Sequence, residues 1–269
     1  MIKYIDIHSH LPFKEFDSDR ESVLEEMKEK GIATIAIGTD YEESKKAIEI
    51  AEKHADIFAS VGIHPADNRA EKFEYEKFLK LAKHQKVVAI GECGIDYFYI
   101  DEKIKKEIKD SQQEMFREHV RLAVEVDKPL MLHIRPSKGM DAYDGAIEIL
   151  KKKKEKYGEK VRGNFHFFVG DVATAKKVLD IGFTVSFSGV ITFAKEYEEV
   201  VRFVPLDKMH AETDSPYVAP APERGKRNSP VYVTHIVEKI AEIKVLPVEE
   251  VREQLLKNAE KMFGIVLGA

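Results

Sequence analysis

The chain has 269 residues, 43% of them hydrophobic, which is enough to bury a large core. Its net charge of −5 argues against a protein that coats nucleic acid through overall positive charge, although a local pocket could still bind a few phosphates. The single cysteine, Cys93, excludes an internal disulfide and is typical of a reducing compartment. The sequence shows no N-terminal leader pattern and no run of about 20 apolar residues, so we expect a cytoplasmic protein that does not engage a membrane.

Eight short apolar, β-branched runs alternate with longer amphipathic stretches. Several runs are apolar almost throughout, as in parallel strands covered on both faces. This alternation predicts an α/β fold, a single-domain (β/α)8 TIM barrel over residues 1–269. A doubly wound open sheet is the alternative, which the lack of a glycine-rich phosphate motif after the first strand makes less attractive. The predicted strands are Tyr4–His8, Thr34–Gly38, Phe58–Ile63, Val87–Gly91, Leu130–Ile134, Gly163–Phe167, Thr184–Phe187 and Met209–Glu212.

The stretches between the strands carry helix signals. Residues 17–19 offer side chains that cap a helix N-terminus, and Gly31 stands where a helix commonly ends. An apolar stripe separates the two signals, which predicts a helix between them. Residues 111–126 and 171–179 show the same pattern.

The first predicted strand ends in His8-Ser9-His10. Because side chains alternate along a strand, both imidazoles point to the same side. Neutral imidazole is a common ligand of divalent metals, so the pair could form half of a metal site. Taken alone, the pair could equally be solvated polar residues that close a strand.

Polar residues at the other strand ends favour the metal site. In a barrel of this type the active site lies where the carboxyl ends of the strands converge. Five of the ten histidines occupy such positions, where chance would place about one. The strand-end residues are His8, His10, His64, Glu92, His133, Arg135, His166, Glu212 and Asp214.

The types of ligand suggest two ions. The first and eighth strands are neighbours in a closed barrel, and the fifth and sixth strands are also neighbours, so each pair of strands can supply one site. The predicted ligands are His8, His10 and Asp214 for one ion, and His133 and His166 for the other.

Glu92 is the predicted bridge between these ions. A carboxylate has two oxygens and can serve two ions about 3.5–4 Å apart. We therefore count Glu92 among the catalytic residues. The alternative is a buried glutamate paired with Arg135.

Two metals suit hydrolysis, because they activate water and stabilise charge on the attacked centre. Asp214 could also take the proton of that water. Glu212 could orient the water or a ligand histidine, or it could be a structural acid. His64 could bind a substrate oxygen or protonate a leaving group, and the fork of Arg135 matches a phosphate. A wall position for His64 and a salt bridge for Arg135 are the plain alternatives.

The loop after the eighth strand contains Arg224, Lys226 and Arg227, with Tyr217 and Asn228 nearby. Basic and aromatic residues beside a metal centre suit a phosphate backbone and stacked bases, so we predict that the three basic residues bind substrate. Such a run is also common in a solvated loop. Cys93 follows Glu92 and points away from it, which favours a small buried hydrophobe over a thiol nucleophile.

Several motifs resemble those of the TatD family of metal-dependent deoxyribonucleases, within the amidohydrolase-like barrels. The resemblance implies a TIM barrel in which the six ligands named above hold two divalent ions. It also implies cleavage of DNA phosphodiester bonds from the 3′ end, with Mg²⁺ or a similar ion. The motifs lie at residues 6–10, 61–65, 91–97, 133–135, 187–193, 212–217 and 224–228, with matches at 258–259 and 263–264 near the C-terminus.

Two segments depart from the family pattern. The sixth-strand motif of the family has a small residue after its histidine and Ser or Thr before its glycine, whereas Phe167 and Val169 stand here. Residues 136–145 also differ, and both segments are expected beside the second ion and the substrate entrance. The substrate therefore stays open between DNA, a small ester, amide or phosphoester, and an aminoacyl-tRNA ester. A non-catalytic nucleic-acid or scaffold protein is a further alternative. Loss of metal ligands would indicate it, and none of the predicted ligands is missing here.

The metal and the assembly state are also open. Histidine-rich sites favour Zn²⁺ or Mn²⁺, while Mg²⁺ prefers oxygen ligands, so the candidates are Mg²⁺, Mn²⁺ and Zn²⁺. The sequence does not determine the oligomeric state, for which a monomer is our working expectation. DNA, as a single strand or a 3′ end, is the expected substrate.

Overall fold

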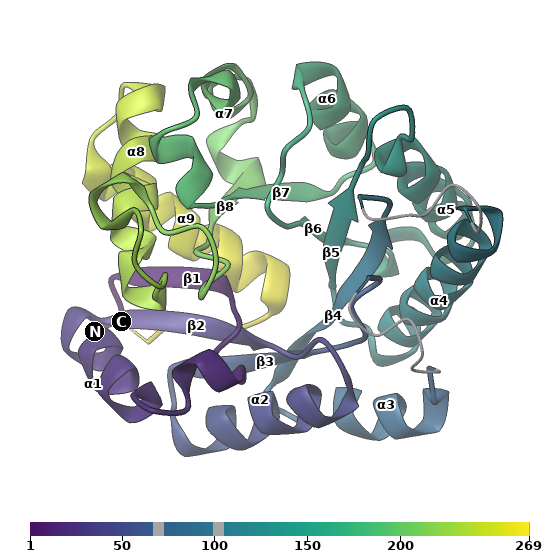
Figure 1. The fold of residues 1–269 in the computed structure, drawn as a ribbon, viewed down its shortest axis with the longest axis horizontal. Helices are drawn as coiled ribbons and strands as arrows, with labels where there is room; N and C mark the ends of the chain where they lie inside the picture. The colour runs from purple at the N-terminus through teal and green to yellow at the C-terminus, as the bar shows by residue number, and fades with distance from the viewer. Residues whose placement is uncertain (67–72, 99–104, 269) are drawn as a thin grey trace.

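The computed structural model describes residues 1–66, 73–98 and 105–268. Figure 1 shows the strands around a central axis and the helices outside them. The strands form one parallel sheet in the order of the chain, which confirms the predicted (β/α)8 barrel over the open sheet. The strands are β1 (Tyr4–Ser9), β2 (Ile32–Ile37), β3 (Ile57–Val61), β4 (Val87–Asp96), β5 (Leu130–Arg135), β6 (Gly163–Phe165), β7 (Thr184–Phe187) and β8 (Met209–Ala211).

The predicted helices are present, with shifted ends. The first ends at Gly31, whose φ of 68° is the left-handed conformation that glycine adopts most easily. The one predicted from residue 111 begins earlier, at Lys105. The helices are α1 (Arg20–Lys30), α2 (Tyr41–Lys53), α3 (Tyr75–Ala82), α4 (Lys105–Val126), α5 (Ala142–Tyr157), α6 (Val172–Asp180), α7 (Glu198–Phe203), α8 (Val233–Lys244) and α9 (Val248–Phe263).

The barrel closes between its first and last strands through the residues that follow β8. Ser9 forms an isolated parallel bridge with Ser215, and the His10 amide donates to the Ser215 carbonyl at 2.8 Å. The Asp214 amide donates to the His8 carbonyl at 2.9 Å. These backbone bonds bring His8 and His10 beside Asp214, although 204 residues separate His10 from Asp214.

A buried carboxylate strengthens the same seam. Asp6 accepts hydrogen bonds from the amides of His8 at 3.1 Å and Thr213 at 2.9 Å, and from the Thr213 hydroxyl at 2.5 Å. Burial raises the pKa of Asp6 to about 8. Asp6 thus ties the strand that carries the first histidines to the segment that carries Asp214.

Strand β4 is longer than predicted, because it continues past Gly91 to Asp96. Its path runs so close to β5 that a side chain would not fit at Gly91 or Gly94. A Cβ there would meet the carbonyl oxygen of Met131 or His133, and both glycines have positive φ, 152° and 144°. The extra length brings Glu92 and Asp96 to the same end of the barrel.

A second group of packed apolar residues lies between the early strands and the C-terminal segment. Phe263, Ile265 and Leu267 join Ile5 and Ile35 in this cluster. The larger core fills the space between the sheet and the outer helices. No helix in the described part of the chain is long and apolar enough to cross a bilayer.

Candidate metal centre

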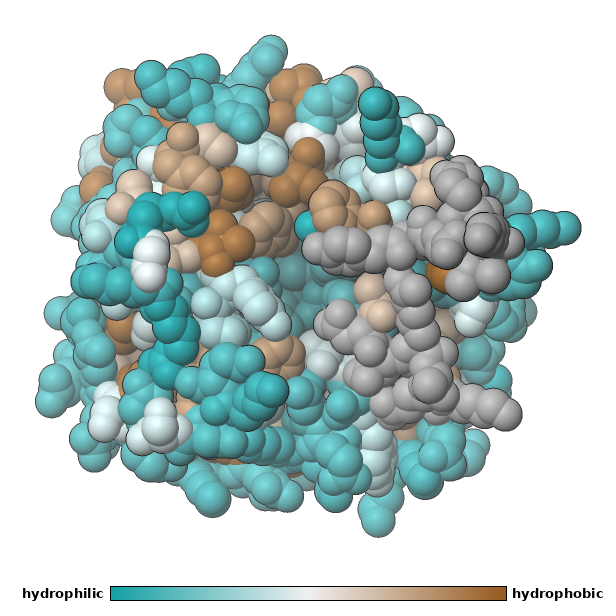
Figure 2. Space-filling view, in the orientation of Figure 1, coloured by the Kyte–Doolittle hydropathy of each residue, from teal (hydrophilic) through white to brown (hydrophobic). Residues whose placement is uncertain are grey.

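A cavity of about 510 Å³ opens at the carboxyl ends of the strands. Figure 2 shows it as the hollow near the centre of this face. Seven of the predicted site residues line it, while His8 lies fully buried beneath it. The lining residues are His10, Phe13, His64, Ala66, Glu92, Asp96, His133, Ile134, Arg135, His166, Phe167, Val169, Asp214, Tyr217 and Val218.

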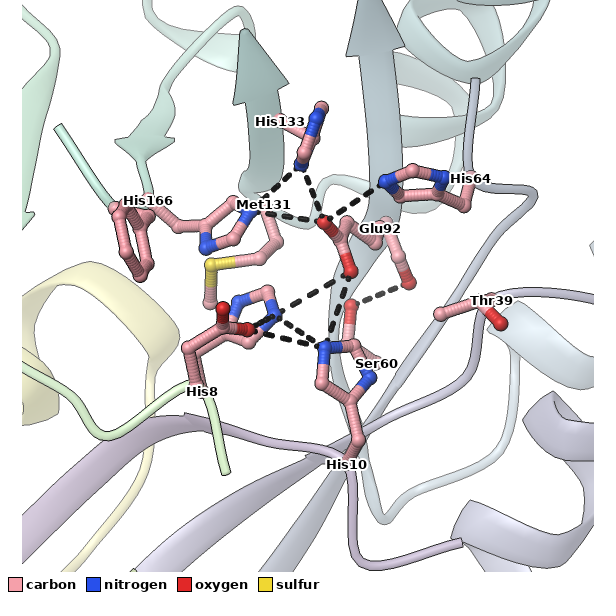
Figure 3. A network of polar contacts seen from close by, with 12 residues as sticks. His8, His10, Thr39, Ser60, His64, Glu92, Met131, His133 and His166 are labelled. Carbon is pink, nitrogen blue, oxygen red and sulfur yellow. Dashed lines mark hydrogen bonds and ion pairs between the residues drawn. The ribbon is translucent and has the colours of Figure 1, made fainter. Parts of the chain in front are cut away.

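The two carboxylate oxygens of Glu92 face two different pairs of histidines (Figure 3). Oε2 lies 3.4 Å from Nε2 of His8 and 3.5 Å from Nε2 of His10. Oε1 lies 2.9 Å from Nδ1 of His133 and 2.8 Å from Nε2 of His166. Burial alone would raise the pKa of Glu92, but the surrounding histidines hold it well below its usual range. Glu92 is therefore an anion with one oxygen available to each side.

The first side contains the donors of one cation site. The Nε2 atoms of His8 and His10 are 3.3 Å apart, and Asp214 Oδ1 lies 3.1 Å from the second of them. Among the described residues, the buried Oε2 of Glu92 accepts no hydrogen bond. Buried polar atoms rarely stay unpaired. Two imidazoles that converge on such an oxygen, with the Asp214 carboxylate against one of them, fit a divalent transition metal.

The second side has a supporting carboxylate that the sequence analysis missed. Nδ1 of His133 lies 3.2 Å from Nε2 of His166, while its Nε2 lies 2.9 Å from Asp96 Oδ2. Burial would lower the pKa of His133, but its hydrogen bonds to Asp96 and Glu92 raise it to about 8. A carboxylate behind a ligand histidine fixes its ring for the metal. Asp96 stands four residues after Glu92 on β4. A prediction that extended this strand to Asp96 would have placed both side chains on the same side.

Glu212 lies behind His166. Its Oε1 accepts from the Phe167 amide at 2.6 Å and lies 3.5 Å from His166 Nδ1. Its Oε2 accepts from the Ser186 hydroxyl at 2.6 Å. Glu212 therefore contacts a candidate ligand histidine and also bonds to β7. These contacts agree both with a role in orienting that histidine and with a structural role.

His64 and Arg135 both face the cavity. His64 Nδ1 accepts from the Ala66 amide at 3.2 Å, so the neutral ring carries its proton on Nε2, which lies 3.6 Å from Glu92 Oε1. The Arg135 guanidinium lies over the Phe98 ring, 3.8 Å from its centroid. Within the described residues, Arg135 makes no ion pair with Glu92, so the proposed alternative for Glu92 does not hold.

A family model described as "TatD related DNase" matches residues 5–264. The chain belongs to the TatD family. It is 39% identical to the "Uncharacterized metal-dependent hydrolase YabD" of Bacillus subtilis strain 168 over 264 residues, which cover 97% of this chain and 98% of that protein. It is 34% identical to the YcfH hydrolase of Escherichia coli K12, with coverage of 97% and 96%. The crystal structure of YjjV, a TatD homolog from Escherichia coli K12, superposes with a TM-score of 0.87 at 25% identity and covers 98% of this chain and 99% of its own.

These matches and the clustered ligands identify this TatD protein as a metal-dependent hydrolase. The resemblance stated from the motifs is thereby confirmed. The two relatives named above are described only as metal-dependent hydrolases, so the substrate is a separate question.

The basic loop of this TatD chain lies outside the cavity wall. Arg227 donates to both carboxylate oxygens of Asp19, at 2.8 and 2.7 Å. Lys226 pairs with Glu223 at 2.7 Å. Arg224 makes no ion pair among the described residues, and none of the three basic side chains is among the described cavity-lining residues. Their predicted role in substrate binding stays a prediction.

Aromatic side chains form part of the cavity wall. Phe13 stacks on His10 with ring centroids 4.4 Å apart, and Tyr217 meets Phe13 edge-on at 6.3 Å. Phe167 and Val169, the departures from the family pattern, also line the cavity. No pattern in the sequence indicated Phe13, because its place in the cavity wall depends on the fold of the segment after β1.

Proposed function

We propose that this TatD protein hydrolyses phosphodiester bonds of DNA as a 3′→5′ exonuclease, with two divalent cations, Mg²⁺, Mn²⁺ or Zn²⁺. The observation that carries the proposal is the carboxylate of Glu92, which presents one oxygen to each of two histidine pairs. Such a bridge is the feature that distinguishes a two-ion hydrolytic site from a single structural ion. The ligands would be His8, His10, Glu92 and Asp214 for one ion, and Glu92, His133 and His166 for the other.

The bound ions would lower the pKa of water and offset the charge that develops on the attacked phosphate. Asp214 accepts the proton of the attacking water. Burial would raise the pKa of Asp214, but its hydrogen bond to His10 holds the pKa below the usual value, so the carboxylate is ready to act as a base. Arg135 faces a phosphate oxygen, and His64 donates a hydrogen bond from its Nε2–H to the leaving oxygen.

Two observations support DNA and an exonuclease. The family model carries the description of a DNase. The cavity of about 510 Å³ is of the size that encloses a small molecule, which suits one terminal nucleotide better than the middle of a strand.

A small phosphoester or ester is the second candidate. Phe167 and Val169 make part of the cavity wall apolar, and apolar walls with few polar groups are typical of small-molecule sites. The same metal centre could hydrolyse such a substrate, so one set of assays should compare both.

The test uses purified protein reconstituted with Mg²⁺, Mn²⁺ or Zn²⁺ in turn. The substrates are 5′-labelled single-stranded DNA, duplex DNA, RNA and bis(p-nitrophenyl) phosphate. We expect a ladder of products shortened from the 3′ end of DNA and about two metal equivalents per chain. Intact DNA with every metal would refute the proposed substrate, while turnover of the small diester alone would favour the second candidate.

Glu92→Ala and Asp214→Ala are compared with the wild type to test whether Glu92 is shared by both ions. We expect Glu92→Ala to lose both the activity and at least one metal equivalent, because both ions share this carboxylate. Asp214→Ala should lose activity while the ion at His133 and His166 is retained. A Glu92→Ala protein that still binds two ions would contradict the bridge.

A further inference from the structure

An exposed aromatic ring and an exposed arginine lie together beside the cavity. Phe193 is 42% exposed, and the Arg224 guanidinium lies 4.1 Å from the centroid of its ring. The two residues come from the loops after β7 and β8. The Thr192 hydroxyl joins these loops by accepting a hydrogen bond from the Ala221 amide at 2.7 Å. We call Phe193 and Arg224 the rim platform.

The rim platform is continuous with the cavity wall. Arg224 Nη1 donates to the Ala219 carbonyl at 3.4 Å, and the two preceding residues, Tyr217 and Val218, line the cavity. The Tyr217 side chain is 49% exposed. Figure 2 shows hydrophobic residues gathered on the side of the hollow where the loops after β7 and β8 lie in Figure 1. A chain that leaves the cavity on this side therefore meets the platform.

Charge distinguishes Arg224 from the other basic residues of its loop. Glu223 neutralises Lys226, and Asp19 neutralises Arg227. In the part of the chain that the structure describes, no carboxylate pairs with Arg224. A protein of net charge −5 thus presents, beside its proposed metal centre, a cation that no carboxylate of the described residues pairs with. Such a position attracts a phosphate.

We propose that the rim platform binds an unpaired nucleotide of single-stranded DNA, next to the nucleotide held in the cavity. Its base stacks on the Phe193–Arg224 surface, and the outer donors of Arg224 face its phosphate. Bases stack on phenyl rings and on guanidinium planes, and they do so when they are free of a partner strand. This inference rests on the proposed function and narrows it to single-stranded ends.

The test compares substrates that reach the platform with one that does not. Oligothymidylates of two to six nucleotides extend beyond the cavity, whereas bis(p-nitrophenyl) phosphate fills only the cavity. Stacking contributes about 1–3 kcal/mol per base, so Arg224→Ala should raise KM for the oligothymidylates about 5- to 150-fold. Its KM for the small diester should stay unchanged. The slope of log affinity against log salt should fall by about 0.7, the value for one lost phosphate contact on a single strand.

Two further variants separate the platform from general effects. Phe193→Leu keeps an apolar side chain in the loop and removes the ring, so it should also raise KM for the oligothymidylates selectively. Arg202→Ala removes the same charged group from α7, where Arg202 pairs with Glu198 at 2.8 Å. We expect this control to match the wild type with both substrates.

Two results would overturn the rim platform. One is a loss with Arg224→Ala that is equal for both substrates, which would assign Arg224 to loop structure. The other is an equal effect of Arg224→Ala and Arg202→Ala. If the wild type leaves DNA intact, fluorescence anisotropy with a labelled oligothymidylate tests the platform separately. Binding that Arg224→Ala weakens would support the platform although the proposed function had failed, and no binding by the wild type would refute both.

Discussion

A buried histidine in α4 supports the loop that carries His64, and its titration should be visible in the stability of the fold. His119 Nδ1 lies 2.8 Å from the Met115 carbonyl, which can only accept, so Nδ1 carries the proton. Its Nε2 accepts from the Ile63 amide at 3.0 Å, and the Phe73 ring lies 4.2 Å away. Protonation of Nε2 would therefore place a second N–H group directly against the Ile63 amide N–H, in the segment that leads to His64.

The pH-dependent change in the free energy of unfolding follows from the burial of His119. Burial lowers the pKa of His119 from 6.5 to about 4. Because the folded state disfavours the charged form, the stabilisation is complete above pH 6.5 and is lost as the pH falls towards 4. Between pH 8 and pH 5 this amounts to about 2 kcal/mol, and the full difference is about 3.4 kcal/mol.

Urea unfolding at pH 8 and pH 5 measures this effect in His119→Gln, whose amide can replace both hydrogen bonds without titrating in this range. Both proteins are measured with EDTA so that metal release does not contribute. Between the two pH values the wild type should lose about 2 kcal/mol more than the variant. Surface His235→Gln should behave like the wild type. An equal loss in the wild type and His119→Gln would refute the reasoning.

Substitutions at two positions and one labelling experiment test other parts of the structure. Asp96→Asn weakens the support of His133, so metal affinity in equilibrium dialysis should fall about 10–100-fold; an unchanged affinity would argue against that role. Asp6→Ala leaves the Thr213 amide and hydroxyl without their buried acceptor, and urea unfolding should show a loss of about 3 kcal/mol, most of which Asp6→Asn should restore. Equal losses in the two Asp6 variants would contradict the hydrogen-bond explanation. Burial raises the pKa of the Cys93 thiol well above its usual value, so a disulfide reagent should react with it only after unfolding; fast reaction of the native protein would refute its burial.

The barrel and the ligand cluster could be predicted because both depend on local pattern and topology. Apolar runs gave all eight strands, and a parallel barrel brings the carboxyl ends of its strands together whatever the loops do. His8, His10, His133 and His166 could therefore be grouped without knowledge of a single distance. The alternation of side chains along β1 was enough to place the first two on one side.

The end of β4 could not be predicted from the same pattern. The apolar run is no longer continuous after Gly91, because Cys93 and Ile95 alternate there with Glu92, Gly94 and Asp96, yet the strand continues to Asp96. The burial of the carboxylates of Glu92 and Asp96 is compensated by histidines from other strands, such as His133 for Asp96. A polar residue that is satisfied by a partner far along the chain looks like a loop residue in the sequence.

The basic loop shows that substrate-binding residues are hard to predict from the sequence for the same reason. Arg224, Lys226 and Arg227 are equivalent in a sequence, since all three are cations within four positions. Asp19 distinguishes Arg227 from the others in the folded protein, although it lies 208 residues away. Only the three-dimensional structure shows that Arg224 lies over an aromatic ring and pairs with no carboxylate of the described residues.

The proposed metal centre and the proposed substrate contacts of this TatD chain depend on different parts of the fold. The proposed ligands stand at or next to strand ends, and hydrogen bonds accepted by Asp6, Asp96 and Glu212 hold the segments that carry them. Phe167, which follows β6, and Phe193, which follows β7, stand in loops, where another side chain would leave the position of Glu92, the proposed bridging ligand, unchanged. The hydrolytic chemistry can thus be retained while the substrate changes. Measurements of specificity should therefore vary the loops after β6, β7 and β8 and keep the ligands fixed.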